Sequence, residues 1–240
     1  MQTWKDIWNR KTLQLGEGKE DEFTRFCQLK KANGFDVAVS DEQEYYQYFY
    51  DNFLRLYETL LSITNNDIQS VFEVGCGSGV NLMMFGNRGI RELGGIDYSQ
   101  SLVDVCRKFS GGGVFCGEAD TVDTHKKYDV VMSDGVFQYF SSVDYAETVL
   151  NKMLTKASKV VMLGGVHDPD RKEEWLAYRK SLFDDYDARY EGLDKLFLSK
   201  EWIKTIAAKF GKHVTFKENG SDVYWNSRYS YDAYLYADTK

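Results

Sequence analysis

The sequence predicts an α/β fold in which a mostly parallel sheet of seven strands lies between two layers of helices. Two observations predict it. From residue 70 onward, short apolar runs alternate with amphipathic stretches at the spacing of strand–helix units. A glycine-rich turn, GCGSG at 75–79, directly follows the first apolar run. The chain has 240 residues and one proline, which suits one domain better than two.

Five apolar runs are predicted to be parallel strands, because strands that alternate with helices cross over in one direction. The strands are expected at 70–74, 92–97, 113–118, 128–134 and 158–166, with helices between them at 80–87, 99–109 and 143–157. After them, a helix is predicted at 199–211, and two closing strands at 213–218 and 228–238 suit an antiparallel pair at the sheet edge.

The chain is predicted to have an N-terminal helical cap and a core that belong to one domain. The cap is 1–69 and the core is 70–240, with a helical insertion at about 169–198. In the cap, apolar residues of segment 41–63 recur on one helical stripe. Four cap residues belong either to a lid over the site or to anchors that hold the cap to the body: Trp4, Trp8, Phe35 and Asp36.

Composition narrows the possible functions. The net charge of −7 disfavours a nucleic-acid partner, because phosphate contacts need a basic face. No apolar run approaches the length of a membrane span, and the N-terminus lacks the apolar core of a signal peptide. The four cysteines form no CxxC pair and there are three histidines, so no metal site is expected. The thiols are expected to be reduced, as in the cytoplasm.

The strongest local signal is the segment from Glu73 to Gly79, EVGCGSG, between a strand and a helix. Ligands of open α/β sheets bind at such carboxyl ends of strands. Its glycines let the backbone turn sharply and approach a ligand closely. Asp97 ends the second strand, where a carboxylate can accept hydrogen bonds from both hydroxyls of a ribose. Together these features predict a cofactor that contains ribose.

The spacing distinguishes between cofactors. The dinucleotide pattern is G-x-G-x-x-G, whereas this chain has G-x-G-x-G followed by Val80. Glu73, two residues before the first glycine, suits a cationic amino group better than a pyrophosphate. S-adenosyl-L-methionine (SAM) carries an ammonium and a sulfonium and no phosphate. The residues therefore favour SAM over a nicotinamide dinucleotide.

On these motifs the sequence resembles the class I, Rossmann-like SAM-dependent methyltransferases over about 70–165. VFEVGCGSG (71–79), GIDYSQ (95–100), GEADTV (117–122) and YDVVMSDGVFQYF (128–140) resemble the family's first four motifs. The resemblance implies a seventh, antiparallel strand, S-adenosylhomocysteine (SAH) as product, and ribose and adenine contacts from the second and third motifs. The implied cofactor-binding residues are Glu73, Gly75, Cys76, Gly77, Gly79, Asp97, Tyr98, Ser99, Glu118, Ala119, Asp120, Ser133, Asp134 and Gly135.

The fourth motif departs from one branch of this family. Enzymes that methylate exocyclic base nitrogens or glutamine amides carry an Asn/Asp-Pro-Pro-aromatic motif, and here residues 133–136 read SDGV. That substrate class is disfavoured. The pattern SDGVFQYF is more similar to bacterial tailoring methyltransferases that act on small molecules in natural-product or surface-glycan pathways.

Two residues are candidates for catalysis. His167 follows the fifth strand, at the edge where the site is expected, and Asp168 is placed to orient it. The alternative is a loop histidine without a role. Tyr139 follows the fourth strand and is expected to line the pocket.

Four residues are candidates for substrate binding. Phe137 lies either in the pocket wall or in the core. In the insertion, Tyr178 and Tyr190 fall near one helical face, which either closes over the substrate or packs in the core. Arg179 is a candidate to pair with an acidic substrate group; a surface ion pair is the alternative.

The sequence thus predicts a SAM-dependent methyltransferase that acts on an oxygen or nitrogen of a small molecule. The expected partner is a small-molecule acceptor, with no nucleic acid and no membrane. The alternatives are a methyltransferase of protein or RNA, and a SAM-binding subunit without catalytic activity. A nicotinamide-dependent oxidoreductase is disfavoured by the glycine spacing.

Overall fold

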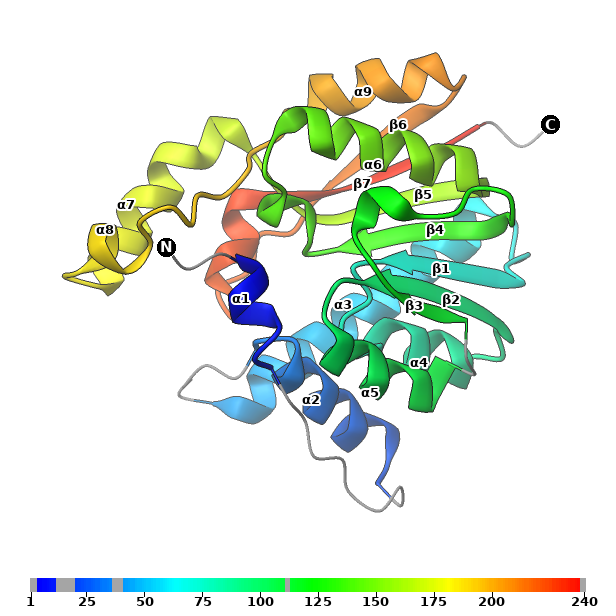
Figure 1. Ribbon diagram of the computed structural model, residues 1–240, viewed down its shortest axis with the longest axis horizontal. Coiled ribbons are helices and arrows are strands. Elements are labelled where there is room, and N and C mark those ends of the chain that lie inside the picture. Colours follow the sequence, from blue (N-terminus) through cyan, green and yellow to red (C-terminus); the bar gives the residue numbers. More distant parts are fainter. Residues whose placement is uncertain (1–3, 12–19, 36–40, 111–112, 238–240) are drawn as a thin grey trace.

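A computed structural model describes residues 4–11, 20–35, 41–110 and 113–237. Its centre is a seven-stranded sheet in the order β3-β2-β1-β4-β5-β7-β6 (Figure 1). The strands are β1 (Ser70–Val74), β2 (Glu92–Asp97), β3 (Val114–Cys116), β4 (Tyr128–Asp134), β5 (Ala157–His167), β6 (His213–Glu218) and β7 (Ser230–Tyr236).

Helices cover both faces of the sheet (Figure 1). They are α1 (Trp4–Trp8), α2 (Glu22–Ala32), α3 (Glu42–Ile63), α4 (Val80–Asn87), α5 (Gln100–Ser110), α6 (Val143–Lys156), α7 (Lys172–Leu182), α8 (Tyr186–Arg189) and α9 (Lys200–Lys209). The predicted three-layer α/β architecture is confirmed, and predicted strand positions agree with the observed ones to within a few residues.

Alternation along the strands divides the interior into two cores. In β4, Val130 packs in one core with α3, α4 and α5, and Val131 packs in the other with α6 and α9. Val160 and Val161 of β5 divide in the same way. Successive side chains of a strand point to opposite faces, so a sheet buried on both faces needs continuous apolar runs.

The sheet has its switch point between β1 and β4. From β1 the chain builds outward through β2 and β3, then returns to place β4 on the other side of β1. The connections that leave β1 and β4 at their carboxyl ends therefore diverge, and a crevice opens between them. This crevice is where the glycine loop lies.

The last two strands form the predicted antiparallel pair, and the structure shows which of the two is the edge strand. β7 is antiparallel to both of its neighbours, β5 and β6. The last strand of the chain is thus inserted next to the edge, and β6 forms the edge itself. This arrangement brings the start of β7 beside the end of β5, so residues near 230 reach the carboxyl edge of the sheet.

The cap shares its core with the sheet. α2 and α3 bury aromatic and aliphatic residues, among them Phe26 and Phe53, in the same core as α4 and α5. Asp41 caps α3 by accepting a hydrogen bond from Glu44 N–H at 2.9 Å. Residues 1–3, 12–19 and 36–40 of the predicted cap, including Asp36, lie outside the described residues.

Candidate cofactor and acceptor site

A cavity of about 750 Å³ lies at the carboxyl edge of the sheet. One part is lined by the glycine loop, Asp97 and the segment 117–120. A second part, which we call the aromatic chamber, is lined by Tyr45, Tyr48, Phe49, Tyr224 and Trp225. The volume lies within the range of small-molecule sites.

The three glycines of the loop have no room for a side chain. Gly75, Gly77 and Gly79 all have positive φ, at 77°, 50° and 83°. A Cβ on Gly77 would meet Asn33 Oδ1 at 2.6 Å, and one on Gly79 would meet Cys106 Sγ at 2.4 Å. Glycine is therefore required at each position for two reasons: the backbone has a positive φ, and a neighbouring side chain occupies the place of a Cβ.

The carboxylate of Asp97 is held in one orientation by the backbone. Oδ2 accepts a hydrogen bond from Gly77 N–H at 2.9 Å, and Oδ1 accepts one from Ser99 N–H at 2.8 Å. Burial raises the pKa of Asp97, and the two N–H groups oppose that shift. Both oxygens keep lone pairs that can accept hydrogen bonds from ligand hydroxyls in the cavity.

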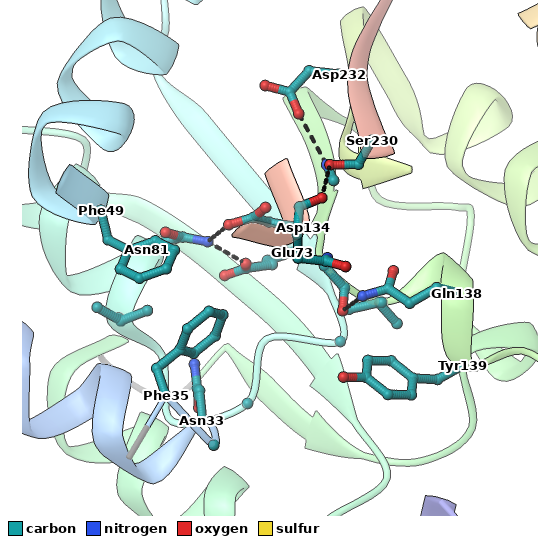
Figure 2. Close-up of a pocket in the computed structure, with 18 of the residues that line it drawn as sticks. Asn33, Phe35, Phe49, Glu73, Asn81, Asp134, Gln138, Tyr139, Ser230 and Asp232 are labelled. Atoms are coloured by element: carbon teal, nitrogen blue, oxygen red, sulfur yellow. Dashed lines mark hydrogen bonds between the residues drawn. The ribbon is translucent and has the colours of Figure 1, made fainter. Parts of the chain in front are cut away.

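Three polar side chains meet beneath the loop (Figure 2). Asn81 Nδ2 donates to Glu73 Oε1 at 2.7 Å and lies 3.4 Å from Asp134 Oδ2. Glu73 Oε2 is buried and has no hydrogen-bond partner within the described chain. Burial raises the pKa of Glu73 well above its usual value. Such an orphaned oxygen fits a ligand that donates a hydrogen bond or carries positive charge.

Twelve of the predicted site residues line the cavity, and eight do not. Those that line it are Glu73, Gly75, Gly77, Asp97, Tyr98, Glu118, Ala119, Asp120, Asp134, Gly135, Tyr139 and Arg179. Those outside its lining are Cys76, Gly79, Ser99, Ser133, Phe137, His167, Tyr178 and Tyr190.

The second set has neighbours elsewhere in the fold. Cys76, Ser99 and Ser133 are buried, and the Ser99 hydroxyl donates to Trp8 O at 3.3 Å. Phe137 is a core residue that packs against Phe140, which corrects the pocket-wall interpretation. Two tyrosines of the insertion contact other rings: Tyr178 lies 5.1 Å from Trp225, and Tyr190 lies 4.8 Å from Tyr186.

The structure places His167 behind the cavity wall rather than in it. Its ring is buried between Trp175 and Phe197, and Nε2 lies 3.1 Å from Asn226 Nδ2. Burial, helped by nearby Lys195, lowers the pKa of His167 to about 3. A ring in this position is neutral and has no direct access to a substrate, so the geometry does not favour the predicted role as base.

Asp168 does not orient His167. Its carboxylate accepts a hydrogen bond from Asp170 N–H at 3.0 Å and lies 3.6 Å from Lys200 Nζ. Asp168 thus begins the turn that follows β5, a local role that its place before Pro169 explains.

Sequence reasoning missed several residues of the lining. Asn81 is a polar residue in the otherwise apolar start of α4, and Asp232 is an acidic residue in the aromatic strand β7. A polar residue isolated in an apolar or aromatic segment is the sequence signal that could have identified Asn81 and Asp232 as lining residues. Asn226 and Tyr224 come from segments without a motif, so nothing in the sequence distinguished them.

Asp232 faces the cavity beyond Asp134 (Figure 2). Its Oδ1 accepts a hydrogen bond from Gly165 N–H at 2.9 Å. Burial raises the pKa of Asp232 to about 7, with Asp134 adding to the shift and Asn219 and Lys217 opposing it. The carboxyl group therefore changes its protonation state near neutral pH.

Helix α1 crosses the cavity and is anchored at both sides. Trp4 and Trp8 contact the ring of Tyr139, with centroids 4.9 and 5.6 Å apart, and both line the cavity. Trp4 Nε1 donates to Asp194 O at 3.2 Å, and Ser101 Oγ donates to Lys11 O at 2.8 Å. These residues are thus anchors and part of the cavity wall at once.

Two further findings concern metals and membranes. No group of three or more His, Cys, Asp or Glu suited to a metal ion occurs within the ranges that the structure describes. Among the helices of those ranges, none combines the length and apolar character needed to cross a membrane.

Part of the chain is similar to a known protein family. Residues 71–165 match the family model described as "Methyltransferase domain". No curated protein matches the sequence.

Three solved structures share the fold. Magnesium protoporphyrin IX methyltransferase (ChlM) from Synechocystis PCC 6803, with bound SAH, has a TM-score of 0.63 at 15% identity, over 91% of this chain and 100% of that one. CalS10, an amino pentose methyltransferase from Micromonospora echinaspora, has a TM-score of 0.60 at 13% identity, over 84% and 98%. DesVI from Streptomyces venezuelae has a TM-score of 0.58 at 14% identity, over 84% and 100%.

The matched segment contains the glycine loop, Asp97 and the ends of β1 and β4, which form one side of the cavity. Residues 71–165 are therefore similar to a methyltransferase domain, and the described chain shares the fold of methyltransferase structures solved with SAM or SAH bound.

Proposed function

We propose that the protein transfers the methyl group of SAM to an oxygen or nitrogen of a small molecule. The observation that carries this proposal is the continuity of the cavity: the glycine loop and Asp97 line the same space as the aromatic chamber. A cofactor on the loop and an acceptor in the chamber would share one enclosure. The comparison structures named for a porphyrin and for an amino pentose support a small acceptor.

The lining residues suggest how the cofactor lies. Asp97 accepts hydrogen bonds from the ribose hydroxyls, and Tyr98, Glu118, Ala119 and Asp120 surround the adenine. Glu73, whose Oε2 lacks a partner within the described residues, faces the cationic methionine end, with Asp134 and Gly135 nearby. The acidic lining suits a cofactor with two positive charges.

When bound, SAM supplies an electrophilic methyl group on a sulfonium. The acceptor's lone pair forms the new bond to the methyl carbon, and the electron pair of the broken C–S bond stays on sulfur. The chain's task is then to align the acceptor, to exclude water and to take up the acceptor's proton. Trp4 and Trp8 of α1 exclude water from one side of the cavity.

We propose Asp232 as the residue that takes up this proton. It lines the cavity, and its pKa of about 7 lets it be unprotonated yet basic at neutral pH. Tyr139 is a donor rather than a base, because burial raises its pKa to about 12. His167 does not line the cavity, but it contacts Asn226, which does. We therefore propose a positioning role for His167.

Binding measurements test the cofactor part of the proposal. We expect SAM and SAH to raise the unfolding temperature and to bind in calorimetry, and NAD to do neither. No response to SAM or SAH would contradict the assigned binding residues.

Turnover measurements test the rest. Release of SAH is followed with a panel of small hydroxyl and amine acceptors, with peptide and RNA pools as controls. Turnover with the pools alone would favour the macromolecular alternative, and SAH binding without any turnover would favour a non-catalytic subunit. We also propose that the enzyme belongs to a natural-product or surface-glycan pathway. Turnover of sugar or polyketide-type acceptors would support this part of the proposal.

A further inference from the structure

We propose that Arg179, with Lys195 behind it, forms an anion-binding subsite at the end of the aromatic chamber, so that the methyl acceptor carries a carboxylate or a phosphate group. This inference rests on the proposed function, since it names a chemical group of that acceptor. Arg179 lines the same cavity as the proposed cofactor residues.

Arg179 lies on α7 and lines the cavity. Its Nε is buried without a hydrogen-bond partner, and no carboxylate of the described chain forms an ion pair with its guanidinium. Aromatic rings surround it instead, with centroids 4.6 to 5.9 Å from Cζ: Trp175, Phe183, Tyr186, Tyr190 and Trp225.

The two other arginines of the insertion show the usual alternative. Arg171 pairs with Glu174 at 2.7 Å, and Arg189 pairs with Asp185 at 3.2 Å. Both are more exposed than Arg179, which is the one facing the cavity. The arginine that needs a counter-charge most is thus the one of these three that lacks it.

Aromatic rings alone do not satisfy the hydrogen-bond donors of a guanidinium. Their faces attract the cation, but they accept none of its five N–H groups in the way an oxygen does. A carboxylate or a phosphate matches the planar fork and can accept two parallel hydrogen bonds. The rings hold the guanidinium in place, and its free N–H groups are available to such an anion.

Lys195 is a second basic side chain in this region. Its Nζ lies 3.3 Å from the ring centroid of Tyr139 and 3.8 Å from that of Trp4. Within the described residues it has no ion pair. Burial first, and then the charge of Arg179, lower the pKa of Lys195 well below its usual value. An anion bound beside these side chains would favour the charged form of Lys195.

Arg179 and the proposed cofactor residues come from different elements of the fold. Arg179 belongs to the insertion that follows β5, and Trp225 beside it precedes β7. The glycine loop follows β1 and Asp97 ends β2, on the other side of β4 in the sheet. The acceptor's anion would therefore lie beyond its reacting atom, and Asp134 and Asp232 would face that atom.

The test uses three fluorinated probes on the full-length protein saturated with SAH. The probes are 4-fluorobenzoate, 4-fluorophenyl phosphate and the neutral 4-fluorobenzyl alcohol, and their affinities are measured by ¹⁹F NMR. We expect at least one anion to bind roughly tenfold more tightly than the alcohol, and the better anion identifies the group.

Two variants assign the preference to Arg179. In Arg179→Met the preference is expected to vanish, because the side chain keeps its length and loses its charge. In the matched control Arg189→Met it is expected to remain. Arg189 belongs to the same insertion and also lies over Phe183, at 4.5 Å, but it is paired and more exposed. If Arg179→Met does not fold, Arg179→Lys is measured instead. An intermediate preference for the anion is expected, because lysine keeps the charge but lacks the planar fork of N–H donors.

Several results would overturn the subsite. They are equal affinity of wild type for all three probes, binding of none of them, or a preference that survives in the Arg179 variant. A loss of SAH affinity in that variant would also overturn it, since the anion would then be the cofactor's own carboxylate. Failure of the wild type to bind SAH would instead contradict the proposed function, so the two failures are distinguishable.

Discussion

Asn33 and Ser78 join the cap to the glycine loop: Asn33 Oδ1 accepts a hydrogen bond from Ser78 N–H at 2.8 Å. Asn33 ends α2, and the Ser78 hydroxyl donates back to Leu29 O in the same helix at 2.9 Å. Two hydrogen bonds thus cross between segments about 45 residues apart in sequence. The glycine loop is thus held by a helix that lies outside the matched residues 71–165.

Asn33→Ala is therefore expected to weaken SAH binding although Asn33 belongs to none of the motifs. The change leaves the Ser78 N–H without its acceptor, a loss of about 0.5–1.5 kcal/mol, or roughly two- to tenfold in affinity. Calorimetry with SAH measures it. Asn33→Asp keeps an acceptor oxygen and should retain more of the affinity. An unchanged affinity in the alanine variant would mean that the loop keeps its shape alone.

Gly77→Ala should weaken SAH binding more than Asn33→Ala does, because its Cβ would displace the Asn33 side chain, whose Oδ1 lies 2.6 Å away, and its φ is positive. Gly211→Ala is the matched control. Gly211 also has a positive φ, at 64°, but nothing lies within 4 Å of its Cβ. It should cost about 1–2 kcal/mol of stability from backbone strain alone and leave SAH affinity as it was. Equal effects of the two changes on binding would contradict the steric argument.

Asp97→Ala is expected to weaken SAM binding through the loss of charge-assisted hydrogen bonds to the ribose. Each is worth roughly 1.5–3 kcal/mol, which is more than tenfold in affinity. Asp104→Ala, at an exposed carboxylate of α5, serves as control in the same calorimetric titration. If both variants bind like the wild type, the ribose assignment is wrong.

Asp232→Asn should lower the rate of methyl transfer to a hydroxyl acceptor by about 10²–10⁴, the usual share of a general base. The wild-type kcat/KM should rise with pH and level off above about 7, because Asp232 acts unprotonated. His167→Gln should keep that inflection and most of the rate. A lost inflection in the His167 variant, with an intact one in the Asp232 variant, would return the role of base to His167.

Asp232 also makes a prediction about stability. Its pKa of about 7 in the folded chain lies above the ordinary value of 3.8, so between these values the folded state keeps a proton that the unfolded state has lost. Its contribution to stability is therefore present at low pH and falls as the pH rises toward 7. Urea unfolding of Asp232→Asn across this range should lose that decline, whereas Asp184→Asn, at an exposed carboxylate, should keep it.

Prediction from sequence succeeded where one local pattern was enough. The strand β1, the turn GCGSG and the helix α4 lie where the apolar run and the glycines place them. The start of the helix predicted at 199–211 likewise depends on residues within one turn, because the Ser199 hydroxyl accepts a hydrogen bond from Trp202 N–H. Asp97 follows from its position at the end of β2, since the carboxyl ends of parallel strands share one edge.

His167 and Asp232 show that a local sequence pattern was not enough to identify the candidate base. Both lie near the carboxyl edge of the sheet, and the sequence favoured the histidine because it follows a parallel strand. The packing of Trp175 and Phe197 over His167 and the insertion of β7 beside β5 decided otherwise. These contacts join segments that have no fixed spacing, so no local pattern predicts them.

By itself, the sequence determined the α/β class, the order of the strands along the chain and the residues of the glycine loop with Asp97. These depend on periodicity and on backbone conformation, which neighbouring residues set. Only the tertiary structure decided which polar groups share the cavity: Asn33, Asn81, Asp232 and Arg179, which has no ion pair within the described residues. Burial and the absence of a counter-charge are properties of the packed chain, and the chemistry of a side chain depends on them as much as on its type.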